Sequence, residues 1–455
     1  MLEASLGPSK VLTAAESCQA FLRDESEAEG ALPDAVVLAE TAEDIQKALG
    51  VAREAEVPIT PRAAGTGRTG GAVPVAGGLV LATLGLNAIK DIDRREGIAV
   101  VQPGVVLAEL HAAVEAEGWF YPPDPNSLAT CAIGGNVAEN AGGPRAFKYG
   151  VTRDYVLGLE VLLMGGQRIR CGRRTLKGVT GYDVTALLVG SEGTLGVFSE
   201  ITLKLIPKPE AVMTLLALFP DVHAACACVA EMTSRGLTPR CIELLDASTL
   251  QAMRDAGNAI DPRAGAMLLM EVDGALPECE RLAERIGVAC DAARALEVLV
   301  AQDAAQRDRL WGARRQMSHA VRRLSKHKLS EDIVVPRQQI GLLLDKVAAT
   351  SDRTAVRCLT YGHAGDGNLH VNFLWNEPEE LPAVEVAIEQ LFRDVVELGG
   401  TLSGEHGIGV LKAPYLPLEQ SAELIALQRD LKRVFDPQNL LNPGKIFPPA
   451  GHKAC

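Results

Sequence analysis

The sequence predicts an α+β protein in which a glycine-rich first domain precedes a second domain with an antiparallel sheet and a helical C-terminal tail. Short strand-like runs alternate with turns and a few helices as far as Lys208, where flanking prolines mark a boundary. Helical runs are longer after it, and glycine clusters return only at 362–367 and 399–409. We expect an N-terminal segment with a short helix, a ligand-binding domain and a second domain, at 1–30, 31–208 and 209–447.

The composition excludes several classes of protein. The 455 residues carry a formal net charge of −13, which gives no electrostatic footprint for nucleic acid or anionic lipid. The ten cysteines include no CxxC pair, so zinc-finger and iron–sulfur spacings are absent and buried thiols in a reducing compartment are expected. The N-terminus has no signal-peptide pattern, and no apolar run approaches the roughly 20 residues of a membrane span. We expect a cytoplasmic protein.

Local patterns in the first domain predict its strands and helices. Thr41 precedes an amphipathic run and is the expected N-cap of a helix at 41–55. A second helix is expected at 107–118, with Gly118 as its C-terminal cap. Strands are expected in the apolar runs at 34–39, 57–62, 78–84, 97–103, 157–164 and 194–209.

Three segments rich in small residues point to one extended ligand. The first, PRAAGTGRTGG at 61–71, follows an expected strand, and its glycines allow backbone N–H groups to form an anion-binding nest. No helix pattern follows it, so it is not the Rossmann fingerprint, and by itself it is equally typical of a surface turn. The segments 122–143 and 190–200 add further glycines, and the former is not expected to form a core helix or strand. Together they fit a dinucleotide.

Two glycine-bearing segments of the second domain carry histidines. In YGHAGDGNLHVNF, at 361–373, alternation predicts a strand with Leu369, Val371 and Phe373 toward a core and Asn368, His370 and Asn372 on the opposite face. In SGEHGIGVLK, at 403–412, glycines flank Glu405 and His406. Taken singly, each histidine is more often structural. Two histidines with a carboxylate are, however, a common divalent-metal set.

These motifs resemble the FAD-linked oxidase family, which has a vanillyl-alcohol-oxidase (PCMH-type) FAD domain of two α/β subdomains. The closest resemblance is to the branch of the glycolate oxidase flavoprotein subunit, D-lactate dehydrogenase and D-2-hydroxyglutarate dehydrogenase. The stretches IGGNVAENAGG, GSEGTLG, GHxGDGNLHxN and EHGIGxxK match the family unchanged, and the resemblance spans about 30–447. Ala63 and Ala64 replace glycines, which preserves the nest if their φ angles are negative. Arg68 replaces an apolar residue and either adds charge near the pyrophosphate or faces solvent.

The resemblance implies FAD along the glycine-rich segments. We expect it to be non-covalent, because His111 and Cys131 are the only nearby attachment candidates and His111 lies in a helical pattern. The implied cofactor-binding residues are Arg62, Ala63, Ala64, Gly65, Thr66, Gly67, Arg68, Thr69, Gly70, Pro123, Asp124, Ser127, Thr130, Gly134, Gly135, Asn136, Ala138, Asn140, Ala141, Gly142, Glu192, Gly196, Val197, Ile201 and Asn442.

The resemblance also implies a metal-assisted reaction. His363, His370 and Glu405 would bind one divalent metal, with Zn²⁺ expected and Mn²⁺ or Fe²⁺ as alternatives, and His406 would be the catalytic base. Arg314, whose alternative is a solvated helix arginine, would bind the substrate together with Ser318, Lys328 and Asn372.

The implied activity is oxidation of a D-2-hydroxy acid of the lactate, 2-hydroxyglutarate, glycolate or malate type. A flavin-binding accessory subunit of a larger dehydrogenase and an oxidase of an uncharged alcohol are the competing interpretations. The expected electron acceptor is an electron-transfer flavoprotein, a quinone or a separate iron–sulfur subunit, and a homodimer is compatible with the sequence.

Overall fold

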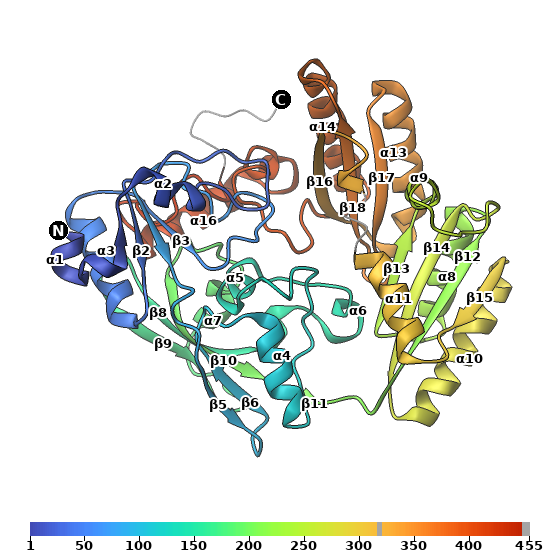
Figure 1. Ribbon diagram of the computed structural model, residues 1–455, viewed down its shortest axis with the longest axis horizontal. Helices are drawn as coiled ribbons and strands as arrows, with labels where there is room; N and C mark the ends of the chain where they lie inside the picture. The colour runs from blue at the N-terminus through green and yellow to red at the C-terminus, as the bar shows by residue number, and fades with distance from the viewer. Residues whose placement is uncertain (316–320, 448–455) are drawn as a thin grey trace. The chain divides into compact units, whose positions relative to one another are not determined.

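The computed structural model describes residues 1–315 and 321–447, which form two compact units. Unit 1 contains Met1–Gly142, Val151–Lys208 and the chain from Glu405, and unit 2 contains Gly143–Gly150 and Pro209–Gly404. Figure 1 shows the elements of each unit. The chain therefore passes between the units four times, and the expected boundary at 208/209 is one of these four points. Residues 405–447, which were expected in the second domain, belong to unit 1.

The described part of unit 1 is built on two larger sheets and a separate two-stranded one, β7 with β11. In the first, of order β1-β2-β4-β3, the last three strands are parallel and β1 is antiparallel, so the N-terminal segment forms part of this sheet. The second is antiparallel, of order β5-β6-β10-β8-β9. Their bounds are β1 Val11–Leu12, β2 Ala35–Leu38, β3 Ile59–Arg62, β4 Leu79–Ala82, β5 Ile89–Asp93, β6 Ile98–Val101, β7 Trp119–Phe120, β8 Val156–Leu162, β9 Arg168–Gly172, β10 Val197–Lys204 and β11 Ile206–Pro207.

The helices of unit 1 are mostly short. The expected cap of α3 is confirmed, because the Thr41 hydroxyl accepts the Asp44 N–H while the Asp44 carboxylate accepts the Thr41 N–H. Gly118, just beyond α4, has a φ of 79° and ends that helix as expected. The helices are α1 Leu2–Leu6, α2 Ala15–Cys18, α3 Ala42–Glu54, α4 Leu107–Ala116, α5 Ile133–Glu139, α7 Val184–Leu188, α15 Leu416–Glu419 and α16 Ala422–Phe435, with 3₁₀ turns at Pro8–Lys10, Gln19–Phe21, Thr152–Tyr155 and Ala413–Tyr415.

The helix α5 corrects one expectation, since the small-residue segment at 122–143 does form a buried helix. Ile133 and Val137, one turn apart, are fully buried. A Cβ at Gly134 would lie 2.9 Å from the carbonyl oxygen of Pro103, so glycine allows the helix to pack directly against that backbone. Asn140 ends the helix in a left-handed conformation, with φ 56°. Small residues here permit close packing and do not prevent a helix.

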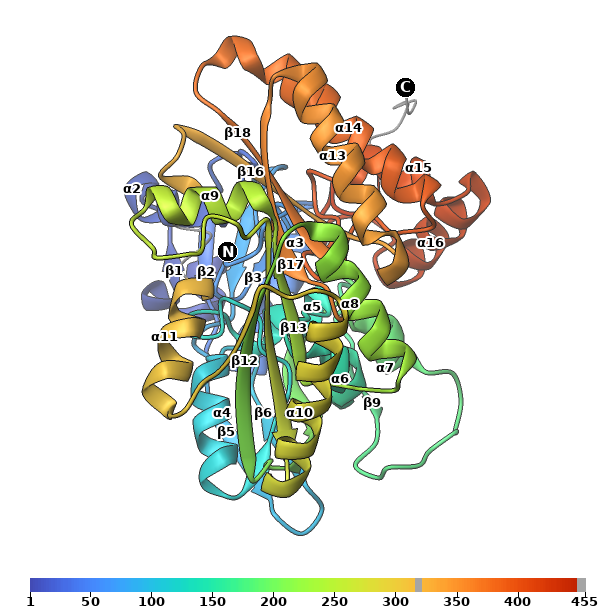
Figure 2. The same ribbon diagram turned by 90° about the vertical axis from the view of Figure 1, so that its right-hand side faces the viewer.

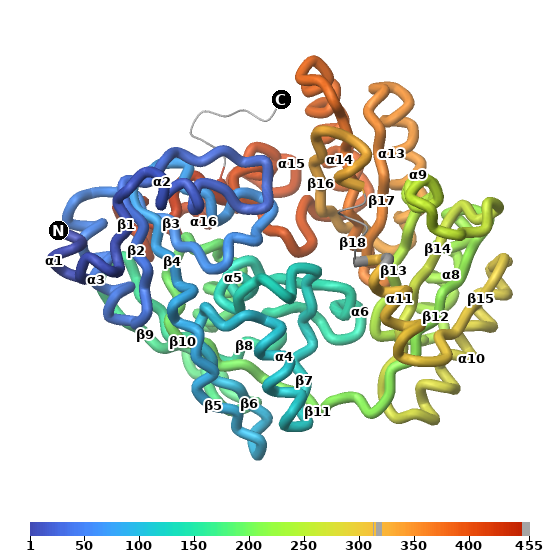
Figure 3. Tube along the Cα trace, viewed as in Figure 1, coloured from blue at the N-terminus to red at the C-terminus, as the bar shows by residue number. Residues whose placement is uncertain are grey.

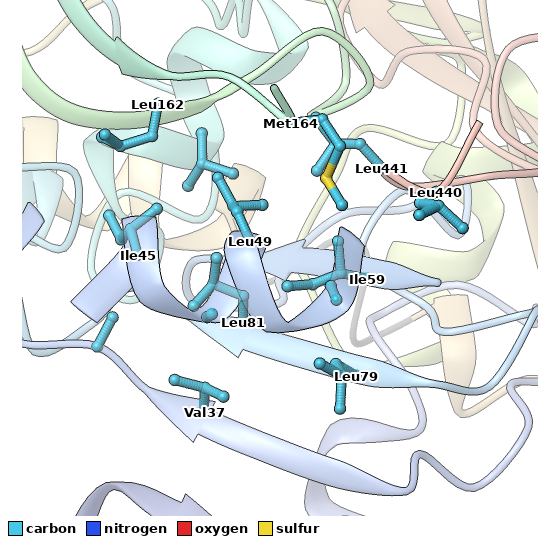
Figure 4. Close-up of a cluster of buried hydrophobic side chains, with 14 of the residues drawn as sticks. Val37, Ile45, Leu49, Ile59, Leu79, Leu81, Leu162, Met164, Leu440 and Leu441 are labelled. Carbon is cyan, nitrogen blue, oxygen red and sulfur yellow. The ribbon is translucent and has the colours of Figure 1, made fainter. Parts of the chain in front are cut away.

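The C-terminal segment completes the core of unit 1. Figure 4 shows Leu440 and Leu441 beside Ile59 of β3 and Leu49 of α3. The N–H of Ile59 donates to the carbonyl of Leu440, and that of Asn442 donates to the carbonyl of Ile59. In Figure 3 the red trace of this segment accordingly lies among the blue strands. Residues from opposite ends of the chain thus share one hydrophobic core.

Replacing Leu441 with alanine should destabilise the protein substantially. The side chain is completely buried, so truncation leaves a cavity and should lower the free energy of unfolding by about 2–5 kcal/mol. Leu427, which is 57% exposed on α16, provides a matched Leu→Ala control that should change it by less than about 0.5 kcal/mol. Denaturant unfolding of both variants measures the difference. Equal effects would show that the tail does not contribute to this core.

Unit 2 is a seven-stranded, wholly antiparallel sheet, as expected. Its order is β15-β12-β14-β13-β17-β18-β16. Both faces of β18 are buried. The strands are β12 Ala211–Phe219, β13 Cys241–Leu245, β14 Ala266–Gly274, β15 Glu297–Val300, β16 His327–Val334, β17 Arg357–His363 and β18 Asn368–Trp375.

Four helices form one layer over this sheet, in the order α10, α8, α13 and α14, each in contact with the next (Figure 2). Phe373 of β18 packs between α13 and α14, so its neighbours His370 and Asn372 point to the other face. The helices are α6 Ala146–Tyr149, α8 Val222–Ser234, α9 Ala247–Asp255, α10 Leu276–Ala292, α11 Ala304–Arg315, α13 Ile340–Thr354 and α14 Leu381–Glu397, with 3₁₀ turns at Arg337–Gln339 and Pro378–Glu380. Among the described residues, none of the helices is long and apolar enough to cross a bilayer.

Candidate active site

The three small-residue segments meet in one cleft of unit 1. The cleft encloses about 1180 Å³, part of it open to solvent. The loop after β3 and helix α5 form much of its wall, together with the start of β10 and the loop before it. The predicted cofactor residues that line it are Arg62, Ala63, Ala64, Gly65, Thr66, Gly67, Arg68, Ser127, Gly134, Gly135, Asn136, Ala138, Ala141, Glu192, Gly196 and Val197.

The loop after β3 meets the conditions for an anion-binding nest. Ala63 and Ala64 are not among the residues of positive φ, whereas Gly65 and Gly70 adopt φ of 70° and 85°. Arg68 lines the cleft, and its guanidinium pairs with Glu25 at 2.9 Å. The condition set for the alanines, a negative φ, is therefore met.

The other predicted cofactor residues lie behind the wall or beside it. Asn442 donates to the carbonyls of Gly71 (3.0 Å) and Glu192 (2.7 Å), so it holds two of the lining loops together. Ile201 is buried within β10. Within the described chain, the predicted residues absent from the lining are Thr69, Gly70, Pro123, Asp124, Thr130, Asn140, Gly142, Ile201 and Asn442.

Glu405 and His406 line the same cleft as the glycine-rich loops. The hydroxyl of Thr69 donates to the carbonyl of His406 at 3.0 Å, which fixes this segment to the loop after β3. The Glu192 carboxylate accepts the N–H groups of Ile408 and Gly409, each at 2.7 Å. Burial raises the pKa of Glu192, although these two backbone bonds act in the opposite direction. These bonds fix the backbone of the segment that carries His406, and its side chain lies on the wall of the cleft.

In unit 2, one face of the sheet gathers polar side chains from four neighbouring strands. Residues directly opposite in an antiparallel pair share a face, and the register pairs Glu243 with His363, Tyr361 with His370, and Asp332 with His370. The predicted alternation along 368–373, in β18, is confirmed. This polar face consists of Glu243, Lys328, Ser330, Asp332, Tyr361, His363, Asn368, His370 and Asn372.

Glu243 is the centre of a buried charge cluster on this face. Its carboxylate bonds to Nδ1 of His363 and accepts from Nε and Nη2 of Arg314 at 2.7 and 2.5 Å. Burial opposes its ionisation, but the charges of His363 and Arg314 lower the pKa of Glu243 to about 2. The guanidinium of Arg314 also stacks 5.0 Å from the ring centroid of Tyr361. Arg314 is only 4% exposed, so the alternative of a solvated helix arginine is wrong.

The remaining predicted residues of unit 2 adjoin this cluster. The rings of His363 and His370 lie 5.4 Å apart, and Nδ1 of His370 is 3.8 Å from Asp332. The amide of Asn372 donates to the carbonyls of Leu359 and His370. Lys328 is 9% exposed on β16, whereas Ser318 lies outside the described residues.

Comparison with known proteins agrees with both halves of the molecule. Residues 33–172 match the "FAD binding domain" family and residues 208–446 match "FAD linked oxidases, C-terminal domain".

The chain belongs to the FAD-linked oxidase family.

Relatives of this FAD-linked oxidase extend over most of its length. It is 43% identical to glycolate oxidase subunit GlcD of Bacillus subtilis, covering 91% of this chain and 89% of that one. It is 35% identical to a D-lactate dehydrogenase of Anaerostipes hadrus, covering 97% and 95%. Among solved structures, p-cresol methylhydroxylase superposes with a TM-score of 0.82 at 16% identity over 98% and 95% of the two chains, which shows the PCMH-type fold. The protein is thus an FAD-dependent oxidoreductase acting on CH–OH groups.

FAD fits the cleft of this FAD-linked oxidase. The wall carries two buried polar atoms without a protein partner, Nδ2 of Asn136 and Oε2 of Glu139. Such atoms are costly unless a ligand or water satisfies them. A long cofactor with polar groups at both ends, lying along backbone N–H groups, supplies such partners. Of the two attachment candidates, His111 contacts the carbonyl of Pro123, Cys131 is buried, and neither is among the described lining residues.

Two polar-face residues of this FAD-linked oxidase were missed by sequence reasoning. Glu243 lies in CIELL and Asp332 in LSEDIVV, and both are completely buried. For Glu243 the available signal was a lone carboxylate inside an otherwise apolar strand, since such a group is rarely buried without a partner. Asp332 follows Glu331 in a strand with several polar residues and gave no such signal. Asp332 also accepts from Gly404 N–H at 2.9 Å, and the next residue in the chain is Glu405.

Proposed function

We propose that this FAD-linked oxidase is a dehydrogenase that oxidises a D-2-hydroxy acid to the 2-oxo acid. The observation that carries the proposal is that Glu405 and His406 line the cleft that fits FAD. An accessory subunit that only binds flavin has no need of an imidazole at that position. Bound FAD supplies the electron chemistry, since its N5 accepts a hydride. The chain's own residues must therefore bind the acid and remove the hydroxyl proton.

We assign the proton transfer to His406. Its side chain is partly buried, with 16% exposure, on the cleft wall, and its backbone is fixed by Thr69. A neutral imidazole with a pKa near neutrality is suited to accept a hydroxyl proton at Nδ1 or Nε2. The glycine at position 407, with φ 79°, lets the backbone turn away immediately after the base.

We assign a divalent metal to His363, His370 and Glu405. His363 fits such a site, because the bond between its Nδ1 and the Glu243 carboxylate fixes the orientation of the ring. A carboxylate behind a ligating imidazole is the usual second partner of a metal-binding histidine. The bond from Gly404 to Asp332 fixes the backbone that leads directly into Glu405. A metal at these residues would polarise the substrate hydroxyl and lower its pKa.

We assign the substrate carboxylate to Arg314, with Lys328 as a second cation and Ser318 and Asn372 as polar neighbours. Arg314 is rigidly held, since Glu243 and the Tyr361 ring fix its guanidinium. Nε and Nη2 each direct one N–H group at Glu243, so the two N–H groups of Nη1 and the second of Nη2 lie outside that pair. A fixed guanidinium can orient a carboxylate through directed hydrogen bonds.

We further infer that FAD is bound without a covalent link and that the electrons pass to an electron-transfer flavoprotein, a quinone or an iron–sulfur subunit. Acid precipitation tests the first point, because non-covalent FAD stays in the supernatant. The positions of His111 and Cys131 support it.

Anaerobic flavin bleaching tests the proposed function. Lactate, 2-hydroxyglutarate, glycolate and malate are added to the holoenzyme, with both isomers of each chiral acid, and 4-hydroxybenzyl alcohol serves as the uncharged control. We expect at least one D-acid, or the achiral glycolate, to bleach the flavin while the uncharged alcohol does not. Bleaching only by the uncharged alcohol would favour the alcohol oxidase, and a flavin stable to every compound would favour the accessory subunit.

A further inference from the structure

Glu139 of α5 is a cleft residue to which the sequence assigned no role. It lies between Ala138 and Asn140, both of which were expected to bind FAD, and it lines the cleft. Its Oε2 atom is buried and has no hydrogen-bond partner within the described protein. Nor does any lysine or arginine of the described chain form an ion pair with it. An uncompensated carboxyl oxygen in a cofactor cleft requires an explanation.

The carboxyl group of Glu139 lies against two glycines, Gly71 and Gly407. A Cβ built at Gly71 would be 2.7 Å from Oε1, and a Cβ at Gly407 would overlap Oε2 at 2.2 Å. The carboxyl group therefore occupies a slot between the loop after β3 and the loop that carries His406. In this arrangement the absence of a side chain at Gly71 and at Gly407 leaves room for it.

The surroundings of Glu139 favour its neutral form. The charges that act on it are the carboxylates of Glu192 and Asp24, and among the described residues Lys445 and Lys412 act on Glu192. Burial raises the pKa of Glu139 well above its usual range, and the charges of Glu192 and Asp24 raise it further. A neutral carboxyl group keeps one O–H to donate, whereas a carboxylate can only accept.

We propose that Glu139 is a cofactor-contacting residue that donates a hydrogen bond from its neutral carboxyl group to the polar edge of the flavin ring. The inference rests on the proposed function in one respect. If His406 takes the hydroxyl proton, the flavin ring must lie at the His406 end of the cleft, where Glu139 also lies. A donor at this edge stabilises the negative charge that flavin gains on reduction, so Glu139 raises the reduction potential of the flavin.

The reduction potential of the bound FAD, measured by anaerobic redox titration without substrate, tests this proposal. Glu139→Ala removes the donor and should make reduction less favourable by roughly tenfold to a hundredfold in equilibrium constant, or about 30–60 mV for a two-electron couple. Glu139→Gln keeps a neutral donor of the same size and should stay near the wild-type potential. Glu54→Gln, at an exposed position of α3, is the matched control and should have no effect.

Each contrary result has a clear meaning. Wild-type potentials in both Glu139 variants would overturn the contact, and a raised potential in Glu139→Gln would show that the native group is an ionised carboxylate, which overturns the donor role. A Glu139→Ala protein isolated without flavin is reconstituted with excess FAD before titration. Because the potential is measured without a hydroxy acid, it is independent of turnover. Failure of the proposed function therefore appears separately, in substrate bleaching.

Discussion

Replacing His406 with alanine should slow flavin reduction by a saturating D-2-hydroxy acid by roughly 10²–10⁴-fold, the usual cost of losing a general base. The imidazole lines the cleft, and the backbone of the same residue is held by the Thr69 hydroxyl through its carbonyl. Alanine keeps that carbonyl, so FAD content should remain at the wild-type level. Anaerobic stopped-flow absorbance of the flavin measures the rate.

A control variant at a second histidine distinguishes loss of the catalytic base from a general effect of replacing histidine with alanine. His223 on α8 is 59% exposed and pairs with Asp345, and His223→Ala should reduce its flavin at the wild-type rate. If His406→Ala also reduces its flavin at the wild-type rate, the base assignment is wrong. The candidates would then be His363 and His370 on the polar face.

Removing the metal should abolish turnover while FAD stays bound. Chelator treatment should strip close to one divalent ion per chain, and Glu405→Gln should lose both metal and activity because an amide replaces a charged ligand. Glu243→Gln should be milder, lowering metal affinity by roughly 10–100-fold, since Glu243 bonds to His363 and would act on the proposed metal only through that ring. Elemental analysis and flavin absorbance of the same samples measure metal and FAD separately.

Glu379→Gln, at an exposed position, provides the control for the charge change and should retain its metal. Full activity in chelator, with no metal detected in the native protein, would contradict the assignment. Loss of FAD together with the metal would instead indicate that the substitution disturbs the cleft itself.

Local patterns predicted much of the fold because they depend on neighbouring residues. Thr41 and Asp44 cap α3 across three positions, and alternation along 368–373 defines the polar and apolar faces of β18. The three small-residue segments were expected to share one ligand, and they do line one cleft. Predicting these features takes only the repeat of side-chain directions along helices and strands and the conformational freedom of glycine.

Features that depend on distant pairing were not predictable in this way. Glu243 meets His363 across 120 positions because of the register between β13 and β17, which no local pattern encodes. Leu441 completes the core around Ile59 although the sequence analysis assigned it to the second domain. The helix α5 was missed because its glycines were taken to be incompatible with packing, whereas Gly134 is required by the nearby Pro103 backbone.

In the proposed reaction the flavin takes its hydride from the carbon that bears the hydroxyl of a D-2-hydroxy acid. The most direct test is the anaerobic rate of flavin bleaching by the preferred acid and by the same acid deuterated at C2. We predict bleaching to the two-electron-reduced spectrum with both, and a slower rate with the deuterated acid because the C2–H bond breaks during flavin reduction. A metal-replete holoenzyme whose flavin stays oxidised with all four acids would contradict the account.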